Sequence, residues 1–218
     1  MTTLEARMET ILREAEGLMQ VLRTVRALDL PDWLVFSGAV YGPIWNHLTG
    51  RPLDHGLSDY DLGYFDASDI SYEAEDVVIR RVAAAFEPPL RELVEVRNQA
   101  RVHLWFEDHF GEPYSPLASS AQALERFAAP AFSVGVRLEP DDRLTIFAPF
   151  GLDDLFALRI RPNPTRHARG LPQIIAKAKA RWPELTAEVG TSRLRQAAGK
   201  GRECGGDGGR GDLIRREK

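Results

Sequence analysis

The stretch that most constrains this chain is a short acidic run at 57–65, LSDYDLGYF, which follows a glycine-bearing turn. Successive side chains of a β-strand point to opposite faces, so Asp59 and Asp61 share one face at a separation of about 6.6 Å. The intervening Tyr60 and the following Leu62 then point to the other face. Two carboxylates placed in this way can share a divalent cation such as Mg²⁺. The run therefore predicts a strand with one face for the core and one for a metal ion.

The glycine-bearing turn leads from a buried strand into a short helix. The apolar run WLVF at 33–36 predicts the strand, and the apolar residues around Trp45 predict a helix that ends at Gly50. Backbone N–H groups at a helix N-terminus point toward a bound anion, and glycine lets the backbone approach it closely. The strand, turn and helix therefore predict a phosphate cradle built on the amides of Gly38 and Ala39.

These features resemble, in their order, the polymerase-β-like nucleotidyltransferase superfamily, in which an acidic strand follows a Gly-bearing turn and a further acidic strand follows later, here near Glu95. A closer resemblance is to the bacterial group of nucleotidyltransferase family proteins, and it spans roughly residues 30–185. It rests on the combination and order of six short motifs: LPDW at 30–33, WNHLTGRP at 45–52, SDYD at 58–61, SYEAED at 71–76, VRNQARVHLW at 96–105 and APFGLDDLFAL at 148–158.

The resemblance implies an α/β (α+β) fold, with a small mixed β-sheet flanked by helices. It implies transfer of an NMP group from an NTP, with Mg²⁺ or Mn²⁺ as the cofactor and pyrophosphate as the leaving group. In the superfamily an acid on a neighbouring strand completes the metal site and can accept the proton of the attacking hydroxyl. This assigns Glu95 as the third catalytic and metal-binding carboxylate beside Asp59 and Asp61, with Glu92 as the weaker rival. The acceptor stays open among a small molecule, a protein and an RNA end.

Two positions depart from the pattern of the superfamily. Ala39 stands where many members carry a serine that contacts the triphosphate, and Ser37 is the candidate to replace that serine. The second departure is Gly42-Pro43, where close relatives are expected to carry a polar pair. Proline is tolerated in the first turn of a helix but not in its interior. The helix is therefore predicted either to start near Pro43 or to have a distorted beginning.

A polar segment follows the second acidic strand, which the alternation of charged and apolar residues predicts at 90–96. Asn98, Arg101 and His103 lie in this segment and are candidates for contacts with the nucleotide or its phosphates. The alternative is that they form a buried hydrogen-bonded network without a ligand. The residues alone leave both interpretations open.

Several charged groups elsewhere are interpreted as structural or solvent-exposed. Acids in the first turn of a helix interact favourably with its dipole. The acids that follow Ser71 are such a set: Glu73, Glu75 and Asp76. Asp153 and Asp154 are predicted to cap a later helix that ends before Pro162. The basic residues at 177–181 are predicted to form a solvated helix face.

Periodicity and composition divide the chain into three parts. Apolar residues at helical spacing predict an amphipathic N-terminal helix, within residues 1–29, that packs on the core. Residues 30–188 are predicted to form the nucleotidyltransferase-like domain, which includes a β-hairpin with strands at 132–138 and 144–148. Residues 191–218 are rich in glycine and charge, and are predicted to be disordered because they offer little apolar surface to bury.

Charge and cysteine content narrow the classes of function. Residues 191–218 carry eight Lys and Arg against four Asp and Glu, which leaves 20 basic against 28 acidic residues in 1–190. This acidic core argues against broad nonspecific binding of nucleic acids. No apolar run approaches the roughly 20 residues needed to span a bilayer. The single cysteine, Cys204, excludes an internal disulfide, so a cytoplasmic protein is expected.

Two rival functions use the same acidic residues. A nonenzymatic nucleotide-binding or regulatory protein would keep the metal and NTP site but lose turnover through the altered turn around Ala39 and Pro43. A metal-dependent phosphohydrolase would consume NTP with water alone and would need no acceptor. Nucleotidyl transfer is the leading interpretation.

Overall fold

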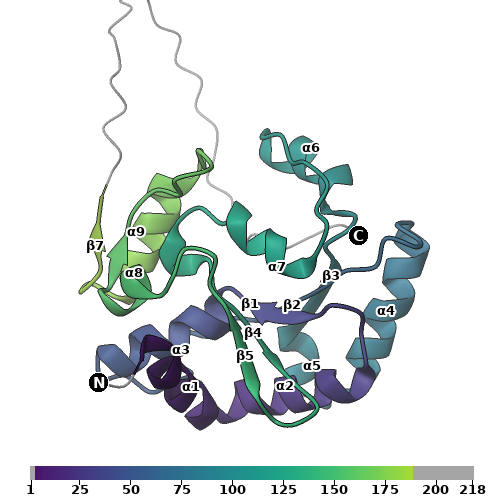
Figure 1. The fold of residues 1–218 in the computed structure, drawn as a ribbon, viewed down its shortest axis with the longest axis horizontal. Helices are drawn as coiled ribbons and strands as arrows, with labels where there is room; N and C mark the ends of the chain where they lie inside the picture. Colours follow the sequence, from purple (N-terminus) through teal and green to yellow (C-terminus); the bar gives the residue numbers. More distant parts are fainter. Residues whose placement is uncertain (1–2, 189–218) are drawn as a thin grey trace, which may run out of the picture.

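The structure, a computed structural model, describes residues 3–188 and is built around a five-stranded mixed β-sheet in the order β3-β2-β1-β4-β5 (Figure 1). The strands β2 and β3 run parallel, and the other neighbouring pairs in this sheet are antiparallel. The strands are β1 (Leu34–Phe36), β2 (Tyr60–Tyr64), β3 (Val94–Asn98), β4 (Gly135–Leu138) and β5 (Leu144–Phe147). A small parallel sheet pairs β6 (Arg159–Ile160) with β7 (Thr186–Ala187).

Helices cover both faces of the large sheet (Figure 1). One face carries α1 (Leu4–Glu14), α2 (Glu16–Leu28) and α4 (Tyr72–Ala84). The helices α6, α7 and α9 lie on the opposite side of the sheet. The remaining helices are α3 (Gly38–Leu48), α5 (Leu90–Leu93), α6 (Phe106–Phe110), α7 (Ser120–Ala123), α8 (Asp153–Phe156) and α9 (Leu171–Arg181). The predicted fold class, a small mixed sheet flanked by helices, is confirmed.

The N-terminal segment forms two helices and not the single helix that its periodicity predicts. The side chain of Thr3 caps α1 by accepting a hydrogen bond from the backbone N–H of Ala6, and Ala15 breaks the helical path with ψ of 86°. The apolar stripe of both helices is nevertheless buried, because α1 packs on α3 and α2 packs on the sheet. A Cβ atom at Gly17 would lie 2.3 Å from the hydroxyl oxygen of Tyr60, so glycine is required at this approach of α2 to β2.

An aromatic cluster joins α3 to the end of α9. The rings of Trp45 and Trp182 lie 5.0 Å apart, and Tyr41 and Phe132 pack against Trp45 at 4.8 and 5.6 Å. The indole N–H of Trp45 donates to the carbonyl of Leu155 at 3.0 Å, so the buried ring keeps its polar atom satisfied. This cluster holds the C-terminal end of α9 against α3.

Buried Asn46 ties three segments together at the centre of this cluster. Its amide N–H₂ donates to the carbonyls of Leu53 and His55, each at 3.0 Å, and its side-chain oxygen accepts from the indole N–H of Trp182 at 2.7 Å. The loop at 49–59 and the C-terminal end of α9 are therefore held to α3 by one side chain. That loop leads directly into the acidic strand β2.

Several element boundaries differ from those predicted. Residues 90–96 were predicted as a strand, but the chain forms the short helix α5 before β3 begins at Val94. The helix α3 begins at Gly38, which makes Pro43 an interior residue and not part of the first turn. The two strands of the predicted hairpin are confirmed as β4 and β5.

Parts of the predicted organisation lie beyond what the structure describes. Residues 191–218, predicted to be disordered, fall outside the described residues, and the division of the chain at residues 29 and 188 stays a prediction. Within residues 3–188 no helix combines the length and apolar content that a bilayer-spanning segment needs.

We expect Asn46→Ala to lower the free energy of unfolding by about 3 kcal/mol, because it leaves the buried Trp182 N–H without its acceptor and removes the donor to two partly buried carbonyls. Urea unfolding of the parent and the variant measures the difference. His47→Ala is the matched control, since His47 is the exposed neighbour on the same helix and its loss is expected to change little. Equal stability of the two variants would contradict the central role of Asn46.

Candidate active site

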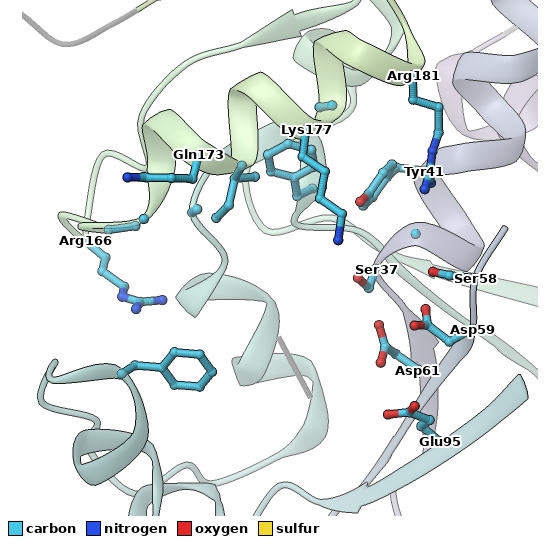
Figure 2. A pocket seen from close by; sticks show the side chains of 18 of the residues that line it. Ser37, Tyr41, Ser58, Asp59, Asp61, Glu95, Arg166, Gln173, Lys177 and Arg181 are labelled. Carbon is cyan, nitrogen blue, oxygen red and sulfur yellow. The ribbon is translucent and has the colours of Figure 1, made fainter. Parts of the chain in front are cut away.

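A cavity of about 360 Å³ opens between the large sheet and α9 (Figure 2). Three acidic side chains line one side of it, and basic side chains from α9 and from the segment before it line the other. Tyr41, Phe132 and Trp182 of the aromatic cluster also line the cavity. The cavity therefore combines a carboxylate wall, a cationic wall and an aromatic surface.

The carboxylate wall follows from the pairing of β2 with β3. Asp61 and Glu95 are Cα partners across these parallel strands, so both side chains lie on the same face of the sheet. Asp59 immediately precedes β2 and shares this face because it lies two residues from Asp61. Asp61 is 8% exposed, whereas Asp59 and Glu95 are partly exposed. All three predicted carboxylates line the cavity, as Figure 2 shows.

The opposite face of β2 belongs to the core, as the alternation of residues predicts. Tyr60, Leu62 and Tyr64 are buried there, and burial, with the charge of Asp54 as a smaller cause, raises the pKa of Tyr60. Tyr60 therefore stays neutral, which is compatible with its contact with Gly17 of α2. Successive residues of β2 thus alternate between the apolar core and the polar cavity.

Gly63 lets the carboxylate face pack closely against its neighbour strand. A Cβ atom at Gly63 would lie 2.5 Å from the ring of Phe36, whose backbone pairs with Asp61. Phe36, Leu34 and Leu124 form a small apolar cluster of buried residues on this side of the sheet. The glycine in the DLG sequence is therefore needed for the packing that holds Asp61 in position.

The turn before α3 adopts a strained backbone at Ser37. Its φ of 64° and ψ of −143° lie close to a region that is occupied almost only by glycine, and such residues store about 1–3 kcal/mol of strain. The Ser37 side chain makes no capping hydrogen bond to α3, and it lines the cavity. Gly38 lines the cavity as well, whereas the Ala39 side chain is 1% exposed and packs into the core. Only the backbone of Ala39 is thus placed for an anion, as part of the first helical turn.

The sequence predicts a solvated helix face at residues 177–181, and Lys177 and Lys179 are exposed, but the position of part of this helix on the cavity was not predicted. Gln173, Lys177 and Arg181 line the cavity, and Figure 2 shows the three side chains extending from one side of α9. They are spaced four residues apart, so they share one face of the helix. This i, i+4, i+8 spacing was the available signal, but nothing in the sequence alone showed which face of the helix meets the acidic strand.

Asn98, the last residue of β3, and Arg101 belong to a buried hydrogen-bonded network, which was the alternative interpretation for this segment. Asn98 is 1% exposed and exchanges hydrogen bonds with the backbone of Asp66 at 3.1 and 2.8 Å. Its backbone N–H donates to Glu75, which is also buried and forms an ion pair with Arg101. His103 has a buried Nδ1 without a hydrogen-bond partner. Asn98, Arg101 and His103 are not among the residues that line the cavity.

The predicted roles of Glu75 and Asp154 are both corrected, because each carboxylate is buried in ion pairs with arginine. Glu75 was predicted to be surface charge, but it is 2% exposed because it fastens α4 to the end of β3. Asp154 was predicted to cap α8, but that helix has no side-chain cap, and Asp154 is buried between Arg159 and Arg161. Each of the two acids joins two segments of the chain through its ion pairs, and neither caps a helix or lies in solvent.

Two residues of the carboxylate wall, Asp59 and Asp61, are suitable ligands for a hard divalent cation. Within the described residues no three His, Cys, Asp or Glu side chains are gathered so that they could hold a metal ion by themselves. Glu95 lines the same cavity beside these two acids, and its role as a third metal ligand stays a prediction. Mg²⁺ is typically held by one or two carboxylates together with substrate phosphates and water, and the pair Asp59 and Asp61 fits this donor set.

We expect Arg101→Ala to lower the free energy of unfolding by about 3 kcal/mol, because Glu75 then stays buried without its cationic partner. Arg80→Ala, which breaks an exposed pair with Asp76, is the control and is expected to change stability by less than about 1 kcal/mol. Chemical denaturation measures both variants. Unchanged stability together with lost nucleotide binding would instead place Arg101 in the binding site.

Comparison with known proteins yields a family and a similar fold. The model of a family described as nucleotidyltransferase matches residues 23–187. The fold is similar to a solved NMR structure whose description says that it reveals a CCA-adding enzyme head domain, with a TM-score of 0.67 and 25% sequence identity. This similarity covers 85% of the present chain and 96% of the other. No curated protein matches the chain.

Proposed function

Because this chain belongs to the nucleotidyltransferase family, we propose that it transfers an NMP group from an NTP to a hydroxyl acceptor in the cavity between β2 and α9. The observation that carries this proposal is the shared cavity of a carboxylate wall and a cationic wall. An NTP carries its negative charge at the triphosphate, and a divalent cation is needed to bring that charge beside carboxylates.

Asp59 and Asp61 are the residues that would hold Mg²⁺ or Mn²⁺. A bound divalent cation supplies neutralisation of the charge on the phosphate oxygens and orients the triphosphate. Asp61 is the more deeply placed of the two, and its position is fixed by pairing with β1 on one side and β3 on the other. Asp59 precedes the strand, at the end of the loop that Asn46 holds.

In the proposed reaction, an oxygen of the acceptor hydroxyl forms a bond to the α-phosphorus of the NTP. The bond from that phosphorus to the oxygen bridging the α- and β-phosphates breaks, and pyrophosphate leaves with the electron pair. The proton of the hydroxyl passes to a carboxylate, for which Glu95 is the candidate because it is the in-register neighbour of Asp61.

The triphosphate would lie between the start of α3 and the basic face of α9. The first intrahelical hydrogen bonds of α3 are donated by Val40 and Tyr41, so the N–H groups of Gly38 and Ala39 precede them and are oriented for an anion. The Ser37 hydroxyl and the Lys177 ammonium line the same cavity. Arg181 packs on the loop before the acidic strand, since a Cβ atom at Gly56 would lie 2.6 Å from its Nε.

The acceptor is proposed to be a ribose hydroxyl at an RNA end. The similarity to a structure described as a CCA-adding enzyme head domain favours this acceptor over a small molecule or a protein. The excess of acidic residues in 1–190 fits recognition of a short end and not of a long phosphate backbone.

We expect Asp59→Asn and Asp61→Asn each to weaken binding of Mg²⁺-NTP roughly hundredfold, because the cation loses one of two anionic ligands while the side-chain shape is kept. Calorimetric titration of the parent and both variants measures this. Asp141→Asn, in the exposed turn between β4 and β5, is the control and is expected to bind like the parent.

The same titration, joined to an assay of pyrophosphate release, separates the rival functions. Unchanged affinity in either Asp variant would sink the two-ligand site. Tight Mg²⁺-NTP binding without pyrophosphate release, with an RNA end present, would instead identify a nonenzymatic nucleotide-binding protein. Release of inorganic phosphate without any acceptor would identify a phosphohydrolase.

We expect Lys177→Ala to weaken Mg²⁺-NTP binding about tenfold, equivalent to roughly 1.4 kcal/mol, through loss of a cation beside the triphosphate. Lys179→Ala is the matched control on the same helix, because Lys179 is exposed and does not line the cavity. Measured at low and at moderate ionic strength, the Lys177 effect should shrink as salt rises. Equal affinities for the two lysine variants would remove α9 from the phosphate site.

A further inference from the structure

The end of the cavity farthest from the carboxylates is formed by a group of residues that the proposed chemistry does not use. Figure 2 shows Arg166 across the cavity from Asp59, Asp61 and Glu95. Phe106, Phe110 and Glu112 line the cavity together with Arg166. We call Phe106, Phe110, Glu112 and Arg166 the distal wall.

Arg166 is held in one orientation by three contacts. Its Nη2 donates to the Glu112 carboxylate at 2.5 Å, and its Nη1 donates to the carbonyl of Arg126. Its guanidinium carbon lies 5.3 Å from the centre of the Phe106 ring. The Arg166 side chain is only 16% exposed, so it does not sample the many rotamers of a surface arginine. The guanidinium therefore presents a fixed planar group at the cavity.

The positive charge of Arg166 is balanced by the adjacent Glu112 carboxylate. Burial alone would raise the pKa of Glu112, but hydrogen bonds from Arg166 and from the backbone N–H of Arg169, with the charge of both arginines, hold the pKa below its ordinary value. Glu112 is thus an anion beside the Arg166 cation. A neutral pair of this kind is a poor site for a phosphate group, in contrast to the basic face of α9.

Aromatic rings support the distal wall and extend it. Phe106 is 4% exposed and packs on Tyr114 at 4.4 Å and on Phe110 at 4.6 Å between ring centres. Phe110 is only partly buried and lines the cavity. Aromatic rings and planar guanidinium groups are surfaces on which nucleic-acid bases stack, with little dependence on base identity.

The face of α9 connects the two ends of the cavity. Gln173 lies on the Arg166 side of Lys177, and Arg181 lies on the side of the carboxylates (Figure 2). At 1.5 Å per residue the line from Gln173 to Arg181 is about 12 Å long, which matches an extended ligand with a charged end and a neutral end. The Gln173 amide is both a donor and an acceptor, the kind of group that pairs with the edge of a base.

We propose that the distal wall is the binding site for the nucleobase of the donor NTP, with the base stacked on Arg166 and Phe110 and with Glu112 holding the guanidinium in plane. This inference rests on the proposed function, because it assumes that the triphosphate occupies the carboxylate end. It makes Arg166 and Phe110 determinants of nucleotide affinity that act on the base and not on the phosphates.

The test compares ligands with and without a base. Calorimetry measures the affinity of the parent for the Mg²⁺ complexes of ATP, GTP, CTP and UTP, and for magnesium tripolyphosphate, which lacks base and ribose. Arg166→Ala and, independently, Phe110→Leu are expected to weaken the tightest-bound NTP on the order of tenfold, and to leave the affinity for magnesium tripolyphosphate unchanged. Unchanged tripolyphosphate binding also shows that a variant is folded. Arg143→Ala, an exposed arginine of the β4–β5 turn, is the control.

Three results would overturn the proposal. The first is a parent that binds magnesium tripolyphosphate as tightly as every NTP. The second is equal weakening of NTP and tripolyphosphate by Arg166→Ala, with Phe110→Leu behaving as the parent, which would make Arg166 a phosphate ligand. The third is unchanged NTP affinity in both variants. Asp61→Asn, titrated alongside, is expected to weaken both classes of ligand, so failure of the base site and failure of the metal site give different patterns.

Discussion

The hydrogen bond from the indole of Trp182 to the side chain of Asn46 is the interaction on which the cavity depends. Asn46 belongs to the helix that follows the strained turn, Trp182 follows the last residue of α9, and the same amide holds the loop that ends at Asp59. The carboxylate wall and the basic wall therefore share one buried polar centre. Because the bond between Trp182 and Asn46 is buried, leaving the indole N–H unsatisfied is costly, and this holds the two walls at a fixed spacing.

The two ends of the cavity differ in the charge of the residues that line them. Anionic and cationic groups face each other at one end, where Asp61 and Lys177 lie, and a charge-balanced pair with aromatic support closes the other. A nucleoside triphosphate has the same division, with its charge at one end and an aromatic ring at the other. The strained backbone at Ser37 fits this arrangement, since strain of this kind persists where surrounding structure holds a functional geometry.

The carboxylates were predictable because alternation along a strand is a local rule: Asp59, Asp61 and the buried face of β2 could be derived from spacing alone. The pairing of Glu95 with Asp61 needed the resemblance to a family, since spacing does not reveal which strands are neighbours. The roles of Glu75, Arg166 and Lys177 could not be derived, because each depends on a contact between segments distant in the chain. A charged residue on an isolated helix looks solvated until its partner is placed, which is why Glu75 was misassigned. Lys177 is exposed, as predicted, but it also lines the cavity.

The pairing of β2 with β3 has a consequence for folding that is separate from chemistry. If β3 slipped by one residue along β2, Glu95 would turn into the apolar layer beneath α2 and α4, and Val94 or Val96 would turn toward the polar cavity. Burying an unpaired carboxylate is among the largest penalties available to a small domain. The acidic residues that equip the cavity therefore also favour the correct strand alignment, because a misaligned β3 would be much less stable.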